Sequence, residues 1–144
     1  FADGDTLDLS FEMPVRRIYC NPRVRANEGQ VALMRGPLVY CFEGVDNGPA
    51  LQELRIPRKA AFSVSELEDE KSPLNGMTVL DFTGKRSSFP SVPEDSLEDA
   101  AEAPFEELYS EEVPLLTDAP MRAVPYFAWG NRGENQMRVW MHES

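Results

Sequence analysis

The sequence contains little of what small catalytic proteins usually rely on. Among 144 residues there is one histidine, His142, and there are two cysteines, Cys20 and Cys41. A Ser-His-Asp or Cys-His catalytic group would have to use His142. That residue lies close to the end of the sequence, where chains often fray, so we expect it to be structural or exposed rather than a general base. Two cysteines exclude a secreted scaffold that is built on several disulfides.

Long hydrophobic runs and ligand-binding motifs are also missing. No apolar run reaches the ~18–20 residues that a membrane-spanning helix needs, so we expect no membrane partner. No phosphate-binding loop, dinucleotide-binding glycine motif, EF-hand loop or nucleophile elbow is present. The cysteines and His142 lack the close spacing that is typical of zinc ligands. We therefore expect free cysteines, no catalytic residue, no metal ligand and no cofactor in this chain.

Positive charge is scarce, and the negative charge is concentrated in one segment. The chain has 14 Lys and Arg against 25 Asp and Glu, a net charge of −11. Ten of the acidic residues, and no basic residue, lie between Ser87 and Met121. An acidic chain repels phosphate backbones, which argues against a nucleic-acid partner. We interpret residues 84–108, which are rich in proline, as a long acidic surface loop with room for a short helix after Pro93.

Alternation of apolar and polar residues predicts strands through most of the remaining chain. Residues 6–13 alternate with a period of two, which predicts a half-buried strand. Residues 30–43 are almost continuously apolar and predict one buried strand with a bulge or bend at Gly36-Pro37. Shorter strands are predicted at 51–56, 61–64 and 77–83.

Near the end of the sequence, residues 122–129 and 137–142 are extended runs separated by a polar, glycine-containing loop, which predicts a hairpin. A convincing helical period is not found outside the acidic segment. Short strands separated by Gly, Pro and Asn predict an all-β fold, an antiparallel β-sandwich that forms a single domain over residues 1–144.

Few side chains stand out as candidates for function. Glu43 and Asp81 are the carboxylates that lie within apolar strands, and alternation predicts that Asp81 faces water. The predicted terminal hairpin gathers aromatic and basic residues, and such a set can hold a sugar ring or a protein surface. These candidate contacts are Tyr126, Trp129, Arg132 and Trp140. The alternative is that both tryptophans pack in or beside the core.

Three segments of the chain carry a family resemblance. They are Met13–Val24, which begins MPVRRIY, Gly29–Glu43 with the sequence GQVALMRGPLVYCFE, and Val124–Trp140, which begins VPYFAWGNRG. Together they resemble the C-terminal region of glycoside hydrolase family 127, the β-L-arabinofuranosidase-like proteins. The resemblance is weak in the middle of the chain and in the acidic segment.

The resemblance implies that catalysis takes place elsewhere in a longer parent chain. In this family a preceding (α/α)6 barrel carries glutamates and zinc-bound cysteines, so zinc is implied only for that absent domain. Cys20 and Cys41 do not match its catalytic motifs. The C-terminal region is implied to be a β-sandwich that packs on the barrel and sometimes contributes to a homodimer. Residues 1–20 are alternatively the last strand or strands of a preceding sandwich.

The resemblance, together with the missing catalytic group, therefore implies a non-catalytic accessory domain that supports the catalytic barrel of the same parent chain and contributes to dimerisation. The parent would hydrolyse a terminal arabinofuranoside or a related linkage. One alternative is a carbohydrate-binding module that uses the Trp129–Arg132 loop. Another is an acidic module in which residues 94–112 bind a basic partner or cations. The small number of cysteines and the family resemblance favour a cytoplasmic location.

Overall fold

The computed structural model describes residue 4, residues 6–89, residue 109 and residues 111–144, and strands dominate this part of the chain. The predicted all-β class is confirmed. The strands are β1 (Val15–Tyr19), β2 (Gln30–Arg35), β3 (Leu38–Glu43), β4 (Leu54–Ile56), β5 (Ser63–Glu66), β6 (Thr78–Ser88), β7 (Leu115–Pro125), β8 (Met137–Arg138) and β9 (Met141–Glu143). The helical elements are one turn of α-helix, α1 (Gly44–Asn47), and the 3-10 turns η1 (Arg25–Asn27), η2 (Leu51–Glu53) and η4 (Tyr126–Ala128).

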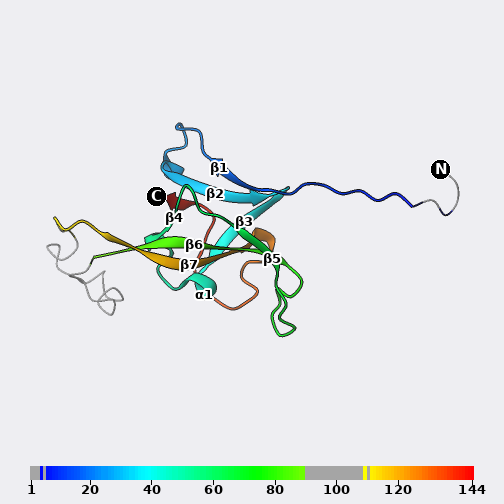
Figure 1. The fold of residues 1–144 in the computed structure, drawn as a ribbon. Coiled ribbons are helices and arrows are strands. Elements are labelled where there is room, and N and C mark those ends of the chain that lie inside the picture. Colours follow the sequence, from blue (N-terminus) through cyan, green and yellow to red (C-terminus); the bar gives the residue numbers. More distant parts are fainter. Residues whose placement is uncertain (1–3, 5, 90–108, 110) are drawn as a thin grey trace.

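The strands form two layers that β3 connects. The hydrogen-bonded order is β1-β2-β9-β4-β6-β7-β3-β8, with β5 added beside β6. β3 pairs with β2 through its first two residues and with β7 through the next two, so the pairings close into a ring. In Figure 1, β1 and β2 lie above β6 and β7, and β3 crosses from one layer to the other. Among the described strands, only β4 and β9 pair in parallel.

The core lies between the two layers. The larger of its two clusters joins apolar side chains from both layers, including Leu33 of β2, Phe42 of β3 and Leu80 of β6. Phe82 meets Phe42 edge to face, with ring centroids 6.1 Å apart. A smaller cluster contains Cys41. Alternate residues of β2, β3 and β6 contribute to the larger cluster, as the two-residue period of a strand requires.

The prediction of one strand over residues 30–43 was wrong, because this run is a hairpin. β2 and β3 are antiparallel, and Arg35 pairs with Leu38 across the two-residue turn Gly36-Pro37. Gly36 has φ +56°, a left-handed conformation that favours glycine. Such a short turn inserts no polar linker between two buried strands, so the run looks continuous in the sequence.

β6 and β7 are the longest strands, and they extend further than the sequence indicated. β6 continues to Ser88, so residues 84–88 belong to a strand and not to the predicted loop. β7 passes through Pro120, although a proline cannot donate a backbone hydrogen bond. One side of β7 pairs with β6 along most of its length. On its other side β7 pairs with β3 only at Val124 and Pro125, so Pro120 lies on an edge of the sheet, where proline is tolerated.

The two terminal runs do not form the predicted hairpin. β8 pairs with β3, and β9 pairs with both β2 and β4. The chain therefore crosses to the other layer after β7 instead of folding back on it. None of the helices among the described residues is long and apolar enough to cross a membrane.

Residues 6–14 differ most from their prediction. They are extended but lie outside the described strands, and β1 begins only at Val15. Leu7, Leu9 and Phe11, predicted to be half-buried, are between 66% and 77% exposed. Figure 1 shows this N-terminal arm running away from the body of the domain. The alternation creates an apolar face on the arm, but among the described residues nothing buries Leu7, Leu9 and Phe11. The predicted helix after Pro93 lies outside the described residues.

Candidate functional site

A fully buried glutamate organises the end of the domain where α1 begins. Glu43 is the last residue of β3, and its side chain is completely removed from solvent. Arg132 reaches it from the loop between η4 and β8, and Nη2 donates a hydrogen bond of 2.5 Å to Glu43 Oε2. A buried charge is tolerated only when it is paired and hydrogen-bonded. Glu43 and Arg132 therefore fix the loop relative to the strand.

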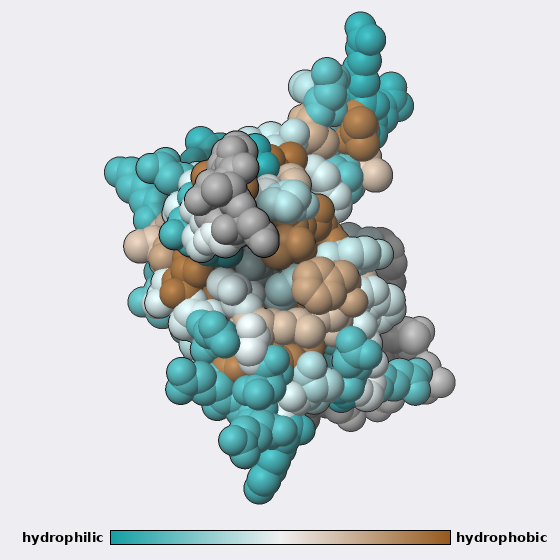
Figure 2. All heavy atoms as spheres, turned by 90° about the vertical axis from the view of Figure 1, so that its right-hand side faces the viewer, coloured by the Kyte–Doolittle hydropathy of each residue, from teal (hydrophilic) through white to brown (hydrophobic). Residues whose placement is uncertain are grey.

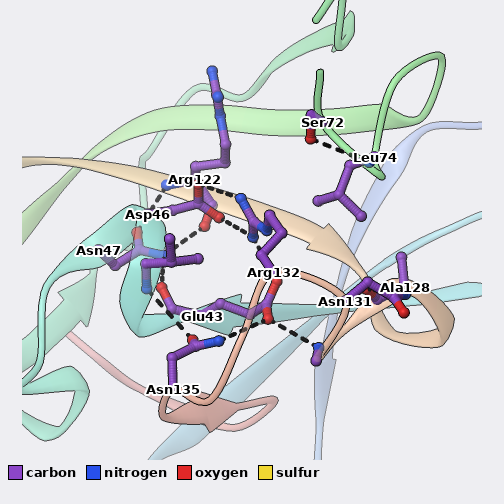
Figure 3. Close-up of polar contacts among 12 residues, drawn as sticks. Glu43, Asp46, Asn47, Ser72, Leu74, Arg122, Ala128, Asn131, Arg132 and Asn135 are labelled. Atoms are coloured by element: carbon purple, nitrogen blue, oxygen red, sulfur yellow. Dashed lines mark hydrogen bonds and ion pairs between the residues drawn. The ribbon is translucent and has the colours of Figure 1, made fainter. Parts of the chain in front are cut away.

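Further contacts complete this arrangement, which we call the Glu43 network (Figure 3). Arg132 also binds Asp46 of α1, with Nη1 2.7 Å from Oδ1. The backbone N–H of Gly130 donates to Glu43 Oε1 at 3.1 Å, and the Asn135 amide donates to the same oxygen at 3.3 Å. The loop is thus held at its beginning, middle and end by one carboxylate and its arginine.

The electrostatics of the network keep Glu43 ionised. Burial alone raises the pKa of the Glu43 carboxyl, but hydrogen bonds from Arg132, Gly130 and Asn135 outweigh burial and leave that pKa below its ordinary value. The hydrogen bond to Asp46, followed by the bond to Glu43, raises the pKa of Arg132 well above its ordinary value. The network is therefore a fixed set of charges, and Glu43 does not have the raised pKa of a general acid.

A second ion pair extends the polar region along β6 and β7. Arg122 binds Asp81 through two hydrogen bonds of 2.7 and 3.0 Å. Asn47 donates to the carbonyl of Arg122 and accepts from its N–H, both at 2.9 Å, and so joins α1 to β7. Asp81 is about one-third exposed, so it faces solvent in part, as alternation predicted, and it is bound by Arg122 as well. Its cross-strand partner in the register is Arg122 itself.

The Glu43 network holds an exposed aromatic turn, η4. Ala128 is buried, whereas Tyr126, Phe127 and Trp129 are between 44% and 64% exposed. The Asn131 amide donates to the carbonyl of Ala128 at 2.9 Å, and Gly130 is fixed by Glu43. The turn follows β7 at the end of the molecule from which the N-terminal arm leaves (Figure 1). The structure therefore presents three aromatic side chains from one rigid turn.

The predicted contact residues are only partly brought together. Tyr126 and Trp129 share the exposed turn, while Arg132 points inward to Glu43 and Asp46. Trp140 is half-buried between β8 and β9, where its indole nitrogen lies 3.3 Å from the side-chain amide of Asn27 in η1. Sequence reasoning missed Phe127 and Asp46. A 3-10 turn breaks the two-residue period, and Asp46 lies in a short polar segment that gives no local sign of its contact with Arg132.

A third carboxylate, Glu143 of β9, forms a separate cluster, the Glu143 cluster. It accepts hydrogen bonds from Arg17 at 3.2 Å, Tyr19 at 2.6 Å and Arg58 at 2.7 Å. The bond from Tyr19 is the largest of the contributions that leave the pKa of Glu143 below its ordinary value. The cluster fastens β9 to β1 and to the segment after β4.

The cysteines and His142 do not form a metal site. Both cysteines are unpaired, and Cys41 lies in the core, where burial raises the pKa of its thiol to about 12. Zinc binds the thiolate form, so Cys41 does not fit that role. Cys20 is half-buried, with its sulfur 3.1 Å from the carbonyl of Asn27. Burial, with nearby Arg55 and Arg138, lowers the pKa of His142. No group of three potential ligands is found among the described residues.

The comparison with protein families places most of the chain in one domain family. The family described as the glycoside hydrolase family 127 C-terminal domain matches residues 15–142. The non-reducing end β-L-arabinofuranosidase of Bifidobacterium longum is 36% identical over 139 residues, covering 95% of this chain. A family 127 β-L-arabinofuranosidase from Geobacillus stearothermophilus T6 is 42% identical with a TM-score of 0.76 over 93% of this chain. A second solved structure, a family 127 β-arabinofuranosidase, has 28% identity and a TM-score of 0.69 and covers 93% of this chain and 18% of its own.

The chain spans only about a fifth of these relatives, 20% of the Bifidobacterium protein and 19% of the Geobacillus protein. The relatives are thus much larger proteins that contain a domain of this kind. The matched range begins at Val15, where β1 begins, and so leaves out the N-terminal arm. With the family match, the relatives and the all-β fold in agreement, the chain belongs to the C-terminal domain family of the glycoside hydrolase family 127 proteins.

Proposed function

We propose that this domain is a non-catalytic accessory domain, which supports the catalytic barrel of a family 127 glycoside hydrolase. The observation that carries the proposal is that arginines already bind the carboxylates set in its strands. Arg132 holds Glu43, and Arg122 holds Asp81 through both oxygens. These pairs stabilise the fold and leave neither carboxylate arranged as a proton donor.

Glycoside hydrolysis uses two carboxyl groups that flank the sugar bond, and the acid among them has a raised pKa. Glu43 has the opposite property, because its hydrogen bonds lower its pKa and its side chain does not reach solvent. An accessory role needs instead a stable body and exposed apolar surface. The exposed turn η4 and the apolar face of the N-terminal arm, which lie at one end of the domain, supply that surface.

The activity of the whole protein follows from its relatives and belongs to the same proposal. Two of the relatives are described as β-L-arabinofuranosidases, and we propose the same class of substrate, a terminal arabinofuranoside, for the parent chain. The barrel would supply the catalytic glutamates and the zinc-bound cysteines. A homodimer that uses this domain is part of the proposal as a second role.

Hydrolysis of an aryl arabinofuranoside tests the proposal directly. The 144-residue chain is expected to give no turnover, and removing it from the parent chain is expected to lower the stability of the remainder. Turnover by the chain that disappears in Glu43→Gln or Asp81→Asn would contradict the proposal. Unchanged melting temperature and activity of the parent without this domain would contradict it as well.

Sugar binding is the second candidate, and the exposure of Tyr126, Phe127 and Trp129 favours it. Aromatic faces on a rigid turn can stack on a sugar ring. Because Arg132 is held by Glu43 and Asp46, the aromatic rings of the Trp129–Arg132 loop region would carry the binding. Titration with arabino-oligosaccharides, followed by tryptophan fluorescence, tests this role. No change at millimolar sugar, or equal binding by Trp129→Ala and a Trp140→Phe control, would exclude it.

A further inference from the structure

Two basic side chains lie next to each other on the outer face of the sheet. Arg55 of β4 lies between Leu54 and Ile56, which are buried in the core. His142 of β9 follows Met141, which is buried as well. Arg55 and His142 therefore point away from the core, because successive residues of a strand face opposite sides. β4 and β9 pair in parallel with Arg55 opposite His142, and paired strands lie about 4.8 Å apart, so the two half-buried side chains are close neighbours.

A third basic residue, Arg138 of β8, acts on both members of this pair. Burial lowers the pKa of His142, and the charges of Arg55 and Arg138 lower it further. Burial and then the charge of Arg138 lower the pKa of Arg55. Charges have such effects only over short distances. We call Arg55, Arg138 and His142 the Arg55 cluster, and its members disfavour one another's charged forms.

The carboxylates around the Arg55 cluster are bound by other side chains. Glu53, whose charge acts on the cluster, accepts a hydrogen bond from Arg86 at 2.8 Å. Asp118 accepts one at 2.6 Å from Lys85, which lies beside the cluster in β6. Glu143 comes next in β9, but it points to the opposite side of the strand and belongs to the Glu143 cluster. None of the three carboxylates neutralises the cluster.

The two arginines of the cluster are therefore left without an acidic partner. Among the described residues, neither Arg55 nor Arg138 forms an ion pair. Arg55 donates through Nη1 to the backbone carbonyls of Gln52 and Leu54, at 2.7 and 3.1 Å, which fixes the guanidinium and leaves Nη2 available. Four other half-buried arginines each bind a carboxylate: Arg17, Arg86, Arg122 and Arg132. In a chain with 25 acidic and 14 basic residues, a repelling pair of arginines indicates a site for an anion.

We propose that the Arg55 cluster binds an oxyanion, the carboxylate or phosphate group of a small ligand. Guanidinium groups donate paired hydrogen bonds to such groups, and a protonated imidazole adds a further donor. A bound anion also removes the repulsion among Arg55, Arg138 and His142.

The site is separate from the surface considered for sugar binding. Figure 2 looks onto the end of the domain from which the N-terminal arm leaves, where brown and tan apolar residues gather between teal hydrophilic ones. The strands β4 and β9 lie toward the other end of the domain in Figure 1, where β9 runs to the C-terminus. Anion binding by the cluster therefore depends neither on the aromatic turn nor on the proposed accessory role.

Because the chain contains one histidine, NMR of the imidazole protons of His142 tests the proposal directly. The 144-residue chain is titrated from pH 8 to pH 5 in sodium chloride, inorganic phosphate or sodium glucuronate of equal ionic strength. In chloride, the pKa of His142 is expected below its ordinary value of 6.5, and a bound anion is expected to raise it to about 6.5 or above, because the anion stabilises the imidazolium. The same pKa in all three salts overturns the proposal.

The two anions, with glucose as a neutral control, identify the group that is bound. A rise of the His142 pKa in phosphate alone assigns the site to phosphate groups, and a rise in glucuronate alone assigns it to carboxylates. A rise in both shows that the site accepts either group. An equal rise in glucose overturns the proposal, because glucose carries no charge.

Variants of equal charge separate the cluster from the net charge of the chain. Arg55→Gln and Arg138→Gln are each expected to weaken binding of the anion at least about 10-fold, the factor that the loss of one charge-assisted hydrogen bond implies. Lys71→Gln removes the same charge from an exposed position and is expected to bind as the wild type does. Equal weakening by Lys71→Gln, or unchanged binding by both arginine variants, overturns the proposal. Without a ligand, Arg55→Gln should itself raise the pKa of His142, which shows that the variant is folded with residue 55 beside the imidazole.

Thermal unfolding gives a second measurement that does not depend on the histidine. A ligand that binds the folded chain raises its melting temperature. The anion that shifts His142 is therefore expected to raise the melting temperature of the wild type and of Lys71→Gln, and to raise that of Arg55→Gln much less. An equal rise in all three proteins would be a general effect of the salt and would contradict a site at the Arg55 cluster.

Discussion

Two glutamates at different places in the fold show how burial changes the role of an ion pair. Glu43 and Glu143 each accept several hydrogen bonds, including bonds from arginine, and each has a lowered pKa. Glu43 is completely buried, and its network fixes a loop. The side chain of Glu143 is 9% exposed and lies at the rim of the domain, where its partner Arg58 is 80% exposed. Water can solvate Arg58 if its bond to Glu143 is lost, whereas Arg132 would remain buried if Glu43 lost its charge.

The two sites therefore stabilise different parts of the domain. The Glu143 cluster joins strands that backbone pairing already holds together, because β9 pairs with β2 and β4. The Glu43 network holds the segment from Gly130 to Asn135, which lies outside the strands. Loss of the network should therefore affect both the stability of the domain and the position of the aromatic turn.

The largest effect is expected for Glu43→Gln in the 144-residue chain. The variant leaves Arg132 partly unpaired in a buried position, which typically lowers the free energy of unfolding by about 3–5 kcal/mol. Urea denaturation at pH 7 measures the change. Glu134→Gln is a matched control, because Glu134 is an exposed glutamate in the same loop and is expected to change stability by less than about 0.5 kcal/mol. Similar losses in both variants would show that burial does not distinguish the sites.

Acid should weaken both sites together. A carboxyl whose pKa is lower in the folded state stabilises the fold above its unfolded pKa, and this contribution is lost as the pH falls. With ordinary values of 4.5 for Glu43 and Glu143, the loss is expected below about pH 4.5. His142 has a lowered pKa as well and adds an earlier loss below its ordinary value of 6.5. Urea denaturation from pH 7 to pH 3 checks this, and Glu43→Gln should decline less steeply than the wild type. Constant stability across the range would contradict it.

A smaller effect is expected for Glu143→Gln. The amide still accepts a hydrogen bond, and solvent is available to Arg58, so the loss should be about 1–2 kcal/mol. In urea denaturation at pH 7, the loss in free energy of unfolding is expected to lie between the losses of Glu43→Gln and of the control Glu134→Gln. A loss as large as that of Glu43→Gln would mean that the rim position of Glu143 does not lower its importance.

The smallest effect is expected within the Glu143 cluster itself. Arg58→Ala removes an exposed ion pair and should cost less than about 1 kcal/mol. Arg17→Ala should cost more, because Arg17 also donates to the carbonyl of Pro57 at 2.5 Å and lies 5.4 Å from the centre of the Phe62 ring. Thermal unfolding of the two variants side by side checks the order. A larger decrease in melting temperature for Arg58→Ala would show that Arg58 stabilises the domain more than Arg17 does.

The sequence contained enough information to predict several strands but not their partners. Residues 77–83 were predicted as a strand and lie within β6, and alternation identified the apolar side of the arm, because a strand's period is local. It could not show that the arm's face is exposed in this chain. The Gly36-Pro37 turn and the edge position of Pro120 depend on which strand lies next to which, and that is a property of the assembled layers.

For the candidate site, the sequence indicated two of the residues but not the contact between them. Glu43 stood out as a carboxylate in an apolar run, and Arg132 stood out in an aromatic loop. Their contact joins residues 89 positions apart in the chain. No local pattern connects them, and the expected hairpin placed Arg132 at the surface. Its inward direction follows from the charge of Glu43, which needs a partner in the core.

The place of β9 in the ring has a consequence for how fast the domain folds. Gln30 of β2 pairs with His142 of β9, and Arg55 of β4 pairs with His142 in parallel. The ring therefore closes only after strands from opposite ends of the sequence have met, which carries a large entropic cost of loop closure. Domains dominated by such distant contacts fold in milliseconds to seconds rather than microseconds. We expect β2 and β3, which are joined by a two-residue turn, to pair early and β9 to join last, as the slow step of folding.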